Sequence, residues 1–461
     1  MSAAGPSETG RTAATSSALR PFLELPGGLA PLGYRNFALY WVGHTVTNSG
    51  RWIELTGAVW LMSELTDSPV LLGLLGVARA VPSIIIGPLG GVLADRVDQR
   101  RLLVATQAFG VVASLLLGSL VLTGLIQFWH IYIQVALQAS IEGVDVSVRQ
   151  ALFPRLVPRP RLADAVMLSA TAARTAMLIG PAIGGIAIAG IGLAAPFLLR
   201  AATFPFLTAA VLWMRGIVPR TATTGSSIRG ELIEGLRHIM TAPPLGALFK
   251  FAVAFGIFNM NPVTITIIGR QVLEVGPEGL GRLLTAPAVG SLIAIGVMLV
   301  MGQTERQGRF VILCTLAYCA SLIAFAASTD QVWSFITLAV IGFFDILVSV
   351  TLFGVMQQVS PNRMRGRVMG NAAAVDRTVR PLAQTQSGIL AGAIGGPLAV
   401  ISAAAALAIT AAIIARADPV LWRSRSDVTP RHDPPRPGEV GSRSTPPSGL
   451  GSEVADSERD V

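Results

Sequence analysis

The stretch from Gly90 to Leu103, Gly-Gly-Val-Leu-Ala-Asp-Arg-Val-Asp-Gln-Arg-Arg-Leu-Leu, decides the fold because it joins two long apolar runs. The runs cover residues 70–92 and 102–122, and a membrane-spanning helix needs about 20 such residues. The charged side chains between them are too costly to place in hydrocarbon; they are Asp95, Arg96, Asp98, Arg100 and Arg101. We therefore expect a tight turn at a water-facing membrane surface. An alternative interpretation is that the turn is a solvated, positively charged loop that only sets the topology.

The composition of the whole chain indicates a membrane protein. Of its 461 residues, 52% are hydrophobic and only 13% are charged, and the mean hydropathy is +0.62. Soluble domains carry roughly a quarter of charged residues. Continuous apolar runs, with room for about twelve spanning helices, extend from residue 36 to 416. The sequence predicts an all-α integral membrane protein with twelve transmembrane helices, without the alternating strands of an outer-membrane barrel.

The expected spans form two groups of six. They cover residues 36–62, 70–92, 102–122, 129–151, 163–187 and 194–214, and then 245–268, 280–301, 310–328, 332–353, 368–393 and 397–416. The predicted domains are a flexible cytoplasmic tail (1–35), an N-terminal bundle (36–214), a cytoplasmic interdomain loop (215–244), a C-terminal bundle (245–416) and a disordered cytoplasmic tail (417–461). The interdomain loop is expected to include an amphipathic helix at 228–240.

The distribution of arginine predicts the orientation. Short loops on one side hold most of the bases, whereas the opposite loops offer Arg270 and Arg282. Because basic loops stay in the cytoplasm, both termini are expected there, in a multi-pass protein of the cell membrane (inner or plasma membrane). The net charge of +9 therefore marks the cytoplasmic membrane surface rather than a nucleic-acid site.

An internal repeat relates the two halves. A shift of 203 positions places Arg174-Thr175 on Arg377-Thr378, Gly185 on Gly388, and Glu142 on Asp345. The common offset covers a loop and both flanking spans, so we expect two related bundles.

The turn carries a family resemblance. The order Gly91-x-Leu93-Ala94-Asp95-Arg96-x-x-x-Arg100-Arg101 resembles the loop between helices 2 and 3 of the major facilitator superfamily. Asp98 stands where members usually have glycine. The variant, together with residues 149–158 and 360–369, is similar to the enterobactin-exporter-like and macrolide-efflux-like branch. This resemblance implies two pseudo-symmetric six-helix bundles that open alternately to each side, with Asp95, Arg96, Asp98, Arg100 and Arg101 as a cytoplasmic gate.

A second motif lies in the fifth span. Gly180-Pro181-Ala182-Ile183-Gly184-Gly185 resembles the Gly-Pro-x-x-Gly-Gly core of antiporters in the same superfamily. Proline kinks a helix, and glycines let a neighbouring helix approach closely. The motif therefore fits both a packing helix and an antiport-specific element.

Ionisable residues within the expected spans are the candidates for proton coupling or substrate binding. Glu142 and Asp345 lie near the middle of their spans without a base three or four residues away on the same helix, and burial disfavours the charged form of such acids. Glu54 could instead belong to a structural ion pair. Asp145 and Arg149 have the spacing of an intrahelical pair. Arg51 shares a helix face with His44 and Asn48.

Several sequence features exclude other functions. There is no G-x-x-x-x-G-K-[ST] loop and no HExxH pair, so we predict no enzymatic activity, no cofactor and no metal. The predicted function is export of small organic molecules such as a drug, siderophore or secondary metabolite by proton antiport. The predicted protein is a monomer, with its substrate, protons and the bilayer as partners. Candidate apolar walls are Trp41, Trp52, Trp60, Phe255 and Phe258. An importer or uniporter, a lysolipid transporter, and a transport-inactive receptor or scaffold remain open alternatives.

Overall fold

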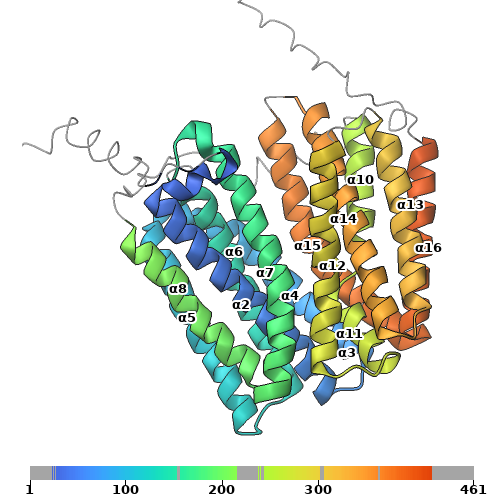
Figure 1. Cartoon of the computed structure of the whole chain (residues 1–461), viewed down its shortest axis with the longest axis horizontal. Coiled ribbons are helices and arrows are strands. Elements are labelled where there is room, and N and C mark those ends of the chain that lie inside the picture. Colours follow the sequence, from blue (N-terminus) through green and yellow to red (C-terminus); the bar gives the residue numbers. More distant parts are fainter. Residues whose placement is uncertain are drawn as a thin grey trace, which may run out of the picture.

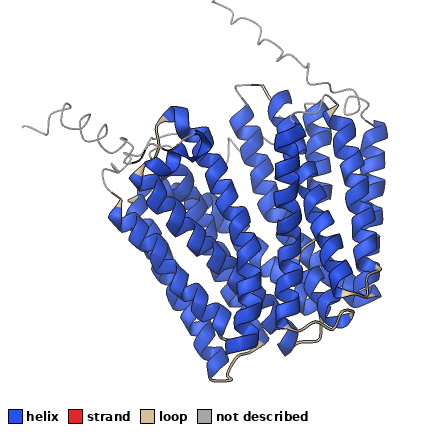
Figure 2. Cartoon of the chain, viewed as in Figure 1, coloured by secondary structure: helices blue, strands red, loops and turns tan. Residues whose placement is uncertain are grey.

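The computed structural model describes residues 23, 25, 27–152, 156–214, 237, 239, 243–301, 306–361 and 364–417. Every regular element within these ranges is a helix (Figure 2). The predicted all-α class is therefore confirmed. Of the predicted amphipathic helix at 228–240 only residues 237 and 239 are described, and the tails beyond these ranges lie outside the described residues.

The helices form two groups along the chain (Figure 1). The first group comprises η1 (Gly27–Gly33), α2 (Arg35–Leu65), α3 (Pro69–Gly73), α4 (Leu75–Arg96), α5 (Gln99–Leu122), α6 (Phe128–Leu152), η3 (Arg159–Arg161), α7 (Leu162–Ile191) and α8 (Ala195–Trp213). The second comprises α10 (Pro243–Ile257), α11 (Pro262–Gln271), α12 (Pro277–Met301), α13 (Gln307–Ala326), α14 (Gln331–Val359), α15 (Arg365–Ile394) and α16 (Gly396–Ala417). Within the first group α2 packs on α7 and α8, and α4 packs on α6; within the second, α14 packs on α12 and α13.

The predicted internal repeat appears in the helix boundaries. The first residues of α7 and α15 are 203 positions apart, and so are their last residues. The first residues of α6 and α14 have the same offset. Gly192 and Gly395, which have the same offset, end α7 and α15 with φ angles of 120° and 84°. Glycine adopts such angles without steric cost. The two halves therefore stop equivalent helices by the same backbone device.

Nine segments of the described chain are long and apolar enough to cross a membrane. The three other expected spans correspond to α2, α6 and α15, which have sufficient length but carry charged residues along it. Such residues face protein or water rather than lipid. The count of twelve therefore stays a prediction for these three helices.

The helix boundaries add two details to the predicted segmentation. The span expected at 245–268 is interrupted between α10 and α11, where Asn261 caps the new helix by accepting from the Thr264 N–H at 3.1 Å. Pro262 follows, and proline lacks an N–H and is favoured at the first position of a helix. The described helices also begin before residue 36, because Ala30 and Pro31 of η1 are buried and η1 contacts α2 and α7.

The two halves touch through close-packed glycines. Helix α7 contacts α12, and α15 contacts α3 and α4. A Cβ atom built on Gly185 would lie 3.1 Å from the Gly281 Cα, and one on Gly388 would lie 2.5 Å from the Gly73 Cα. These distances leave no room for a side chain. Gly185 and Gly388 are equivalent in the repeat. Each therefore forms an equivalent glycine–glycine contact with the other half, Gly185 with Gly281 and Gly388 with Gly73.

Candidate functional site

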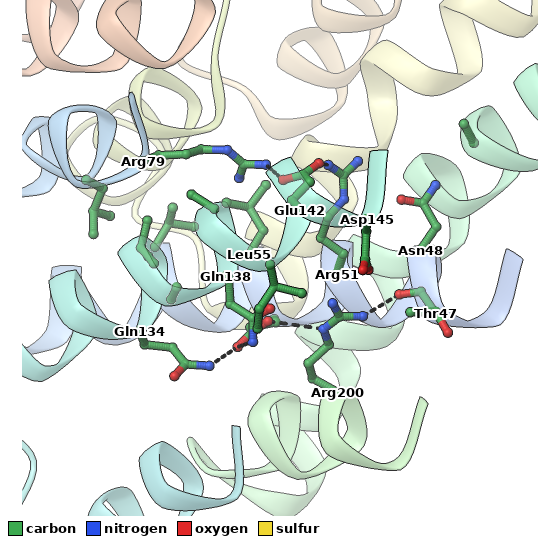
Figure 3. Close-up of a pocket in the computed structure, with 18 of the residues that line it drawn as sticks. Thr47, Asn48, Arg51, Leu55, Arg79, Gln134, Gln138, Glu142, Asp145 and Arg200 are labelled. Carbon is green, nitrogen blue, oxygen red and sulfur yellow. Dashed lines mark hydrogen bonds and ion pairs between the residues drawn. The ribbon is translucent and has the colours of Figure 1, made fainter. Parts of the chain in front are cut away.

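A cavity of about 250 Å³ lies in the N-terminal half of the molecule. Side chains of α2, α4, α6 and α8 line most of it, and Gln384 of α15 adds a wall from the other half. Figure 3 shows its polar side chains converging from these separate helices. His44, Asn48 and Arg51 line it together, so the predicted shared face of α2 is confirmed.

A buried ion pair between Arg200 and Glu54 lines the cavity. The Arg200 Nε lies 3.3 Å from the Glu54 Oε2, and these side chains are only 6% and 8% exposed. Glu54 also accepts a hydrogen bond from the Gln134 Nε2 at 2.6 Å, and Arg200 donates to the Thr47 carbonyl (Figure 3). Glu54 is thus paired across helices with Arg200 rather than with Arg51 on its own helix.

Glu142 lies between two arginines. Arg51 donates to its Oε1, and the Arg79 Nη2 lies 2.7 Å from its Oε2 (Figure 3). All three side chains are partly exposed, by 32%, 24% and 31% for Arg51, Arg79 and Glu142. The sequence correctly shows no base near Glu142 on α6, but α2 and α4 supply two. Glu142 therefore forms its ion pairs with bases of two other helices.

Asp145 and Arg149 have partners other than each other. Asp145 accepts from the Thr106 Oγ1 at 2.6 Å and from the Gln107 Nε2 at 2.7 Å, both on α5. The Arg149 Nη1 lies 3.0 Å from the His44 Nδ1. The predicted intrahelical pair is therefore replaced by contacts between helices.

Asp345 lies on α14 in the other half and does not line this cavity. Its Oδ1 accepts a hydrogen bond from the Asn259 Nδ2 at 2.7 Å and lies 3.8 Å from the Arg380 Nη2. Arg380 makes its shorter contact with Asp376, at 2.7 Å. The structure thus separates Glu142 and Asp345, which the repeat relates, into two different networks.

The predicted gate residues fall into two groups. The side chains of Asp95 and Arg96 lie outside the described residues. Asp98 caps α5 by accepting from the Arg101 N–H at 2.9 Å, and Arg100 donates to the carbonyl of Leu212 on α8. The described contacts of Asp98 and Arg100 are therefore within the N-terminal half, and their gate role stays a prediction.

The glycines of the α7 motif lie at helix contacts. A Cβ on Gly180 would lie 2.4 Å from the Trp52 Cβ, and one on Gly184 would lie 3.1 Å from the Ile53 carbonyl, both on α2. A Cβ on Gly281 would lie 2.6 Å from the carbonyl of Pro181. Gly185 of the same motif also contacts α12. The motif therefore packs α7 against α2 of its own half and against α12 of the other half.

The apolar walls of the cavity differ from those predicted. None of the five predicted aromatic residues is among the described residues that line it; its apolar walls are aliphatic, and include Leu55, Val59, Leu75, Val135 and Ile141. Arg200 was missed as a site residue, although an arginine within the apolar run 194–214 is an available signal.

The family described as "Transmembrane secretion effector" matches residues 26–444. The chain belongs to this family. The transmembrane secretion effector family is one of major facilitator transporters, so the predicted superfamily is confirmed.

Two relatives and one solved structure illustrate the similarity. The multidrug efflux pump Tap of Mycolicibacterium fortuitum is 23% identical, over 75% of this chain and 87% of that protein. The enterobactin exporter EntS of Shigella boydii is also 23% identical, over 68% of this chain and 73% of that protein. A crystal structure of a bacterial homologue of the human lysosomal transporter Spinster, inward-facing and unoccupied, has a TM-score of 0.66 and 13% identity, over 86% of this chain and 98% of that one. Members of this family are multi-pass membrane transporters of small molecules, not enzymes.

Proposed function

We propose that this transporter exports small organic molecules from the cytoplasm in exchange for entering protons. The observation that carries the proposal is the cavity of about 250 Å³, which presents partly exposed charged groups next to the junction of the two halves. Charged side chains within membrane-spanning helices are costly, and those that face an internal cavity commonly mark a substrate or ion pathway. The names of the two relatives, an efflux pump and an exporter, support the direction.

The contacts between the halves support alternating access. Besides the paired glycines, the Arg270 Nη1 on α11 lies 3.5 Å from the Glu64 Oε1 and 3.0 Å from the Ser63 Oγ, both near the end of α2. These contacts lie towards the C-terminal ends of α2 and α15, on the side opposite the first residues of α2 and the last residues of α16 (Figure 1). With cytoplasmic termini, as the arginine distribution predicts, the molecule is closed towards the outside and loads cargo from the cytoplasm.

The charge balance favours Asp345 as the proton carrier. A proton on Asp345 leaves Arg380 with Asp376, its closer partner at 2.7 Å, and Asp376 also remains as a counter-charge for Arg174, the other guanidinium that interacts with Asp345. A proton on Glu142 would instead remove the shared counter-charge of Arg51 and Arg79. Uncompensated charges in a low-dielectric site are costly. In this proposal Asp345 loads and releases protons. Glu142, Arg51 and Arg79, here called the Glu142 cluster, belong to the cargo site.

Inside-out vesicles that carry the transporter test the proposal. A pH-sensitive dye reports an acidic lumen while a panel of organic acids, neutral compounds and cations is added outside. Antiport predicts that a transported compound enters and the lumen becomes less acidic. Entry without a pH change would identify a uniporter, and binding without entry a receptor; either result contradicts the proposal.

Asp345→Asn is the matched variant for the coupling step. We expect it to bind the compound but to lose its dependence on the proton gradient. Asp164→Asn is the control, because it makes the same chemical change at another site. Asp164 forms a partly exposed pair with Arg161 at 3.5 Å. Undiminished coupling in Asp345→Asn would assign the proton to another acid.

A further inference from the structure

The charged groups of the cavity do not balance. It is lined by four guanidinium groups and three carboxylates; these belong to Arg51, Arg79, Arg149 and Arg200, and to Glu54, Glu142 and Asp145. A guanidinium only donates hydrogen bonds, so the His44 Nδ1 beside Arg149 accepts, and the imidazole is neutral in this arrangement. The described lining therefore carries one positive charge in excess.

The excess is accessible at the Glu142 cluster. Glu54 and Arg200 form a closed buried pair, whereas Glu142 is shared by Arg51 and Arg79. Each guanidinium carries five N–H donors, and one from each reaches Glu142. Both side chains are partly exposed and line the cavity, so further donors are available to a ligand.

The uncharged lining of the cavity combines polar side chains, among them Asn48 and Gln384, with an aliphatic wall. Leu55, Val59 and Leu75 lie on α2 and α4, and Val135 and Ile141 lie on α6. An aliphatic wall beside a pair of guanidiniums suits a molecule with an apolar body and an oxyanion at one end. A cationic molecule would meet the excess positive charge instead.

We propose that the cavity selects amphiphilic organic acids, whose carboxylate accepts hydrogen bonds from Arg51 and Arg79 on the side away from Glu142. This deepens the proposed function, on which it rests, by assigning the substrate class of the same site. Arg51 and Arg79 come from different helices of one half, so the carboxylate is held while the other half moves. Gln384 of α15 is the contact through which the second half faces the same ligand.

A matched pair of probes tests the inference on the full chain in lipid nanodiscs. Naphthalene-2-carboxylate and naphthalene-2-carboxamide share a ring and differ in charge, and empty nanodiscs give the background partitioning. We expect the carboxylate to bind about tenfold more tightly than the amide, since charge-assisted hydrogen bonds are the stronger ones. Equal affinities would overturn the inference.

Three variants locate the selectivity. Arg79→Gln should remove most of the preference for the carboxylate, and Arg79→Lys should restore part of it because the charge returns without the planar fork. Arg282→Gln is the control, since Arg282 is 70% exposed and pairs with Glu278 outside the cavity. Melting temperatures equal to the parent show that the variants are folded. A preference that survives in folded Arg79→Gln would also refute the assignment.

The vesicle assay separates this inference from the proposed function. If the carboxylate binds selectively but no compound moves protons, the anion site stands and the antiport proposal fails. If neutral compounds or cations drive proton movement and the carboxylate shows no preference, antiport stands and the anion site fails.

Discussion

Replacing Gly388 by alanine should weaken the closed arrangement of the two halves. A Cβ at this position would lie 2.5 Å from the Gly73 Cα and 2.5 Å from the Pro69 carbonyl, so α15 and α3 must separate by about 1 Å to reach ordinary contact. The obstacles are backbone atoms, which cannot rotate away. Overpacking of this kind costs about 1–3 kcal/mol, and the cost falls only on the state in which the halves touch here. The population of the open state should therefore rise about 5- to 150-fold.

A cysteine at Ser63 measures this change. Ser63 is 8% exposed and contacts Arg270 of the other half, so its thiol reacts only when the halves separate. Cys314 and Cys319 are buried and are replaced by alanine in the background. If opening is fast relative to labelling, the rate with an impermeant maleimide should rise in proportion to the open population.

The control is Gly370→Ala on the same helix, where an added Cβ would meet nothing within 4 Å. It should leave the labelling rate unchanged, because any gain in helix propensity acts on both states. Equal rates for Gly388→Ala and Gly370→Ala, with parental melting temperatures, would refute the idea that this contact holds the halves together.

Three further predictions concern single contacts. Glu54→Gln should lower the free energy of unfolding by about 3–5 kcal/mol, since it leaves Arg200 buried without its counter-charge; thermal melting should show no such loss for the exposed Glu278→Gln. Asp98→Ala should lose about 1 kcal/mol of stability and Asp98→Ser little, because serine also caps helices; equal loss of transport in both would instead support the gate. Arg270→Gln should raise labelling of the Ser63 cysteine about two- to fivefold, because a partly exposed pair contributes only about 0.5–1 kcal/mol; an unchanged rate would show that this pair does not hold the halves together.

Much of the helical layout follows from local patterns in the chain. Apolar runs predict the helices, and the offset of 203 residues, which relates Gly185 to Gly388, also relates the boundaries of α7 and α15. The break between α10 and α11 was missed, although Asn261-Pro262 has the chemistry of a helix start. The mean hydropathy of a window of about 20 residues stays high across such a short break, so an apolar run alone does not reveal it.

Most charged residues of the site could be predicted from the sequence, but the ion pairs that they form could not. Glu142, Glu54 and Arg51 are conspicuous because charge is rare within apolar runs. Their partners Arg79 and Arg200 come from other helices, and spacing along one helix gives no information on rotation between helices. The same limit explains why the glycine contacts between the halves could be expected as packing sites without naming their partners.

If the cavity opens in turn to both sides of the membrane, a cysteine in its wall must be accessible from each side. Asn48, which lines the cavity, is replaced by cysteine in the background without Cys314 and Cys319. An impermeant maleimide is then applied to intact cells and, separately, to inside-out vesicles. We expect labelling from both sides, because alternating access exposes the cavity to each aqueous phase in turn. Labelling from one side only, or from neither, would contradict it.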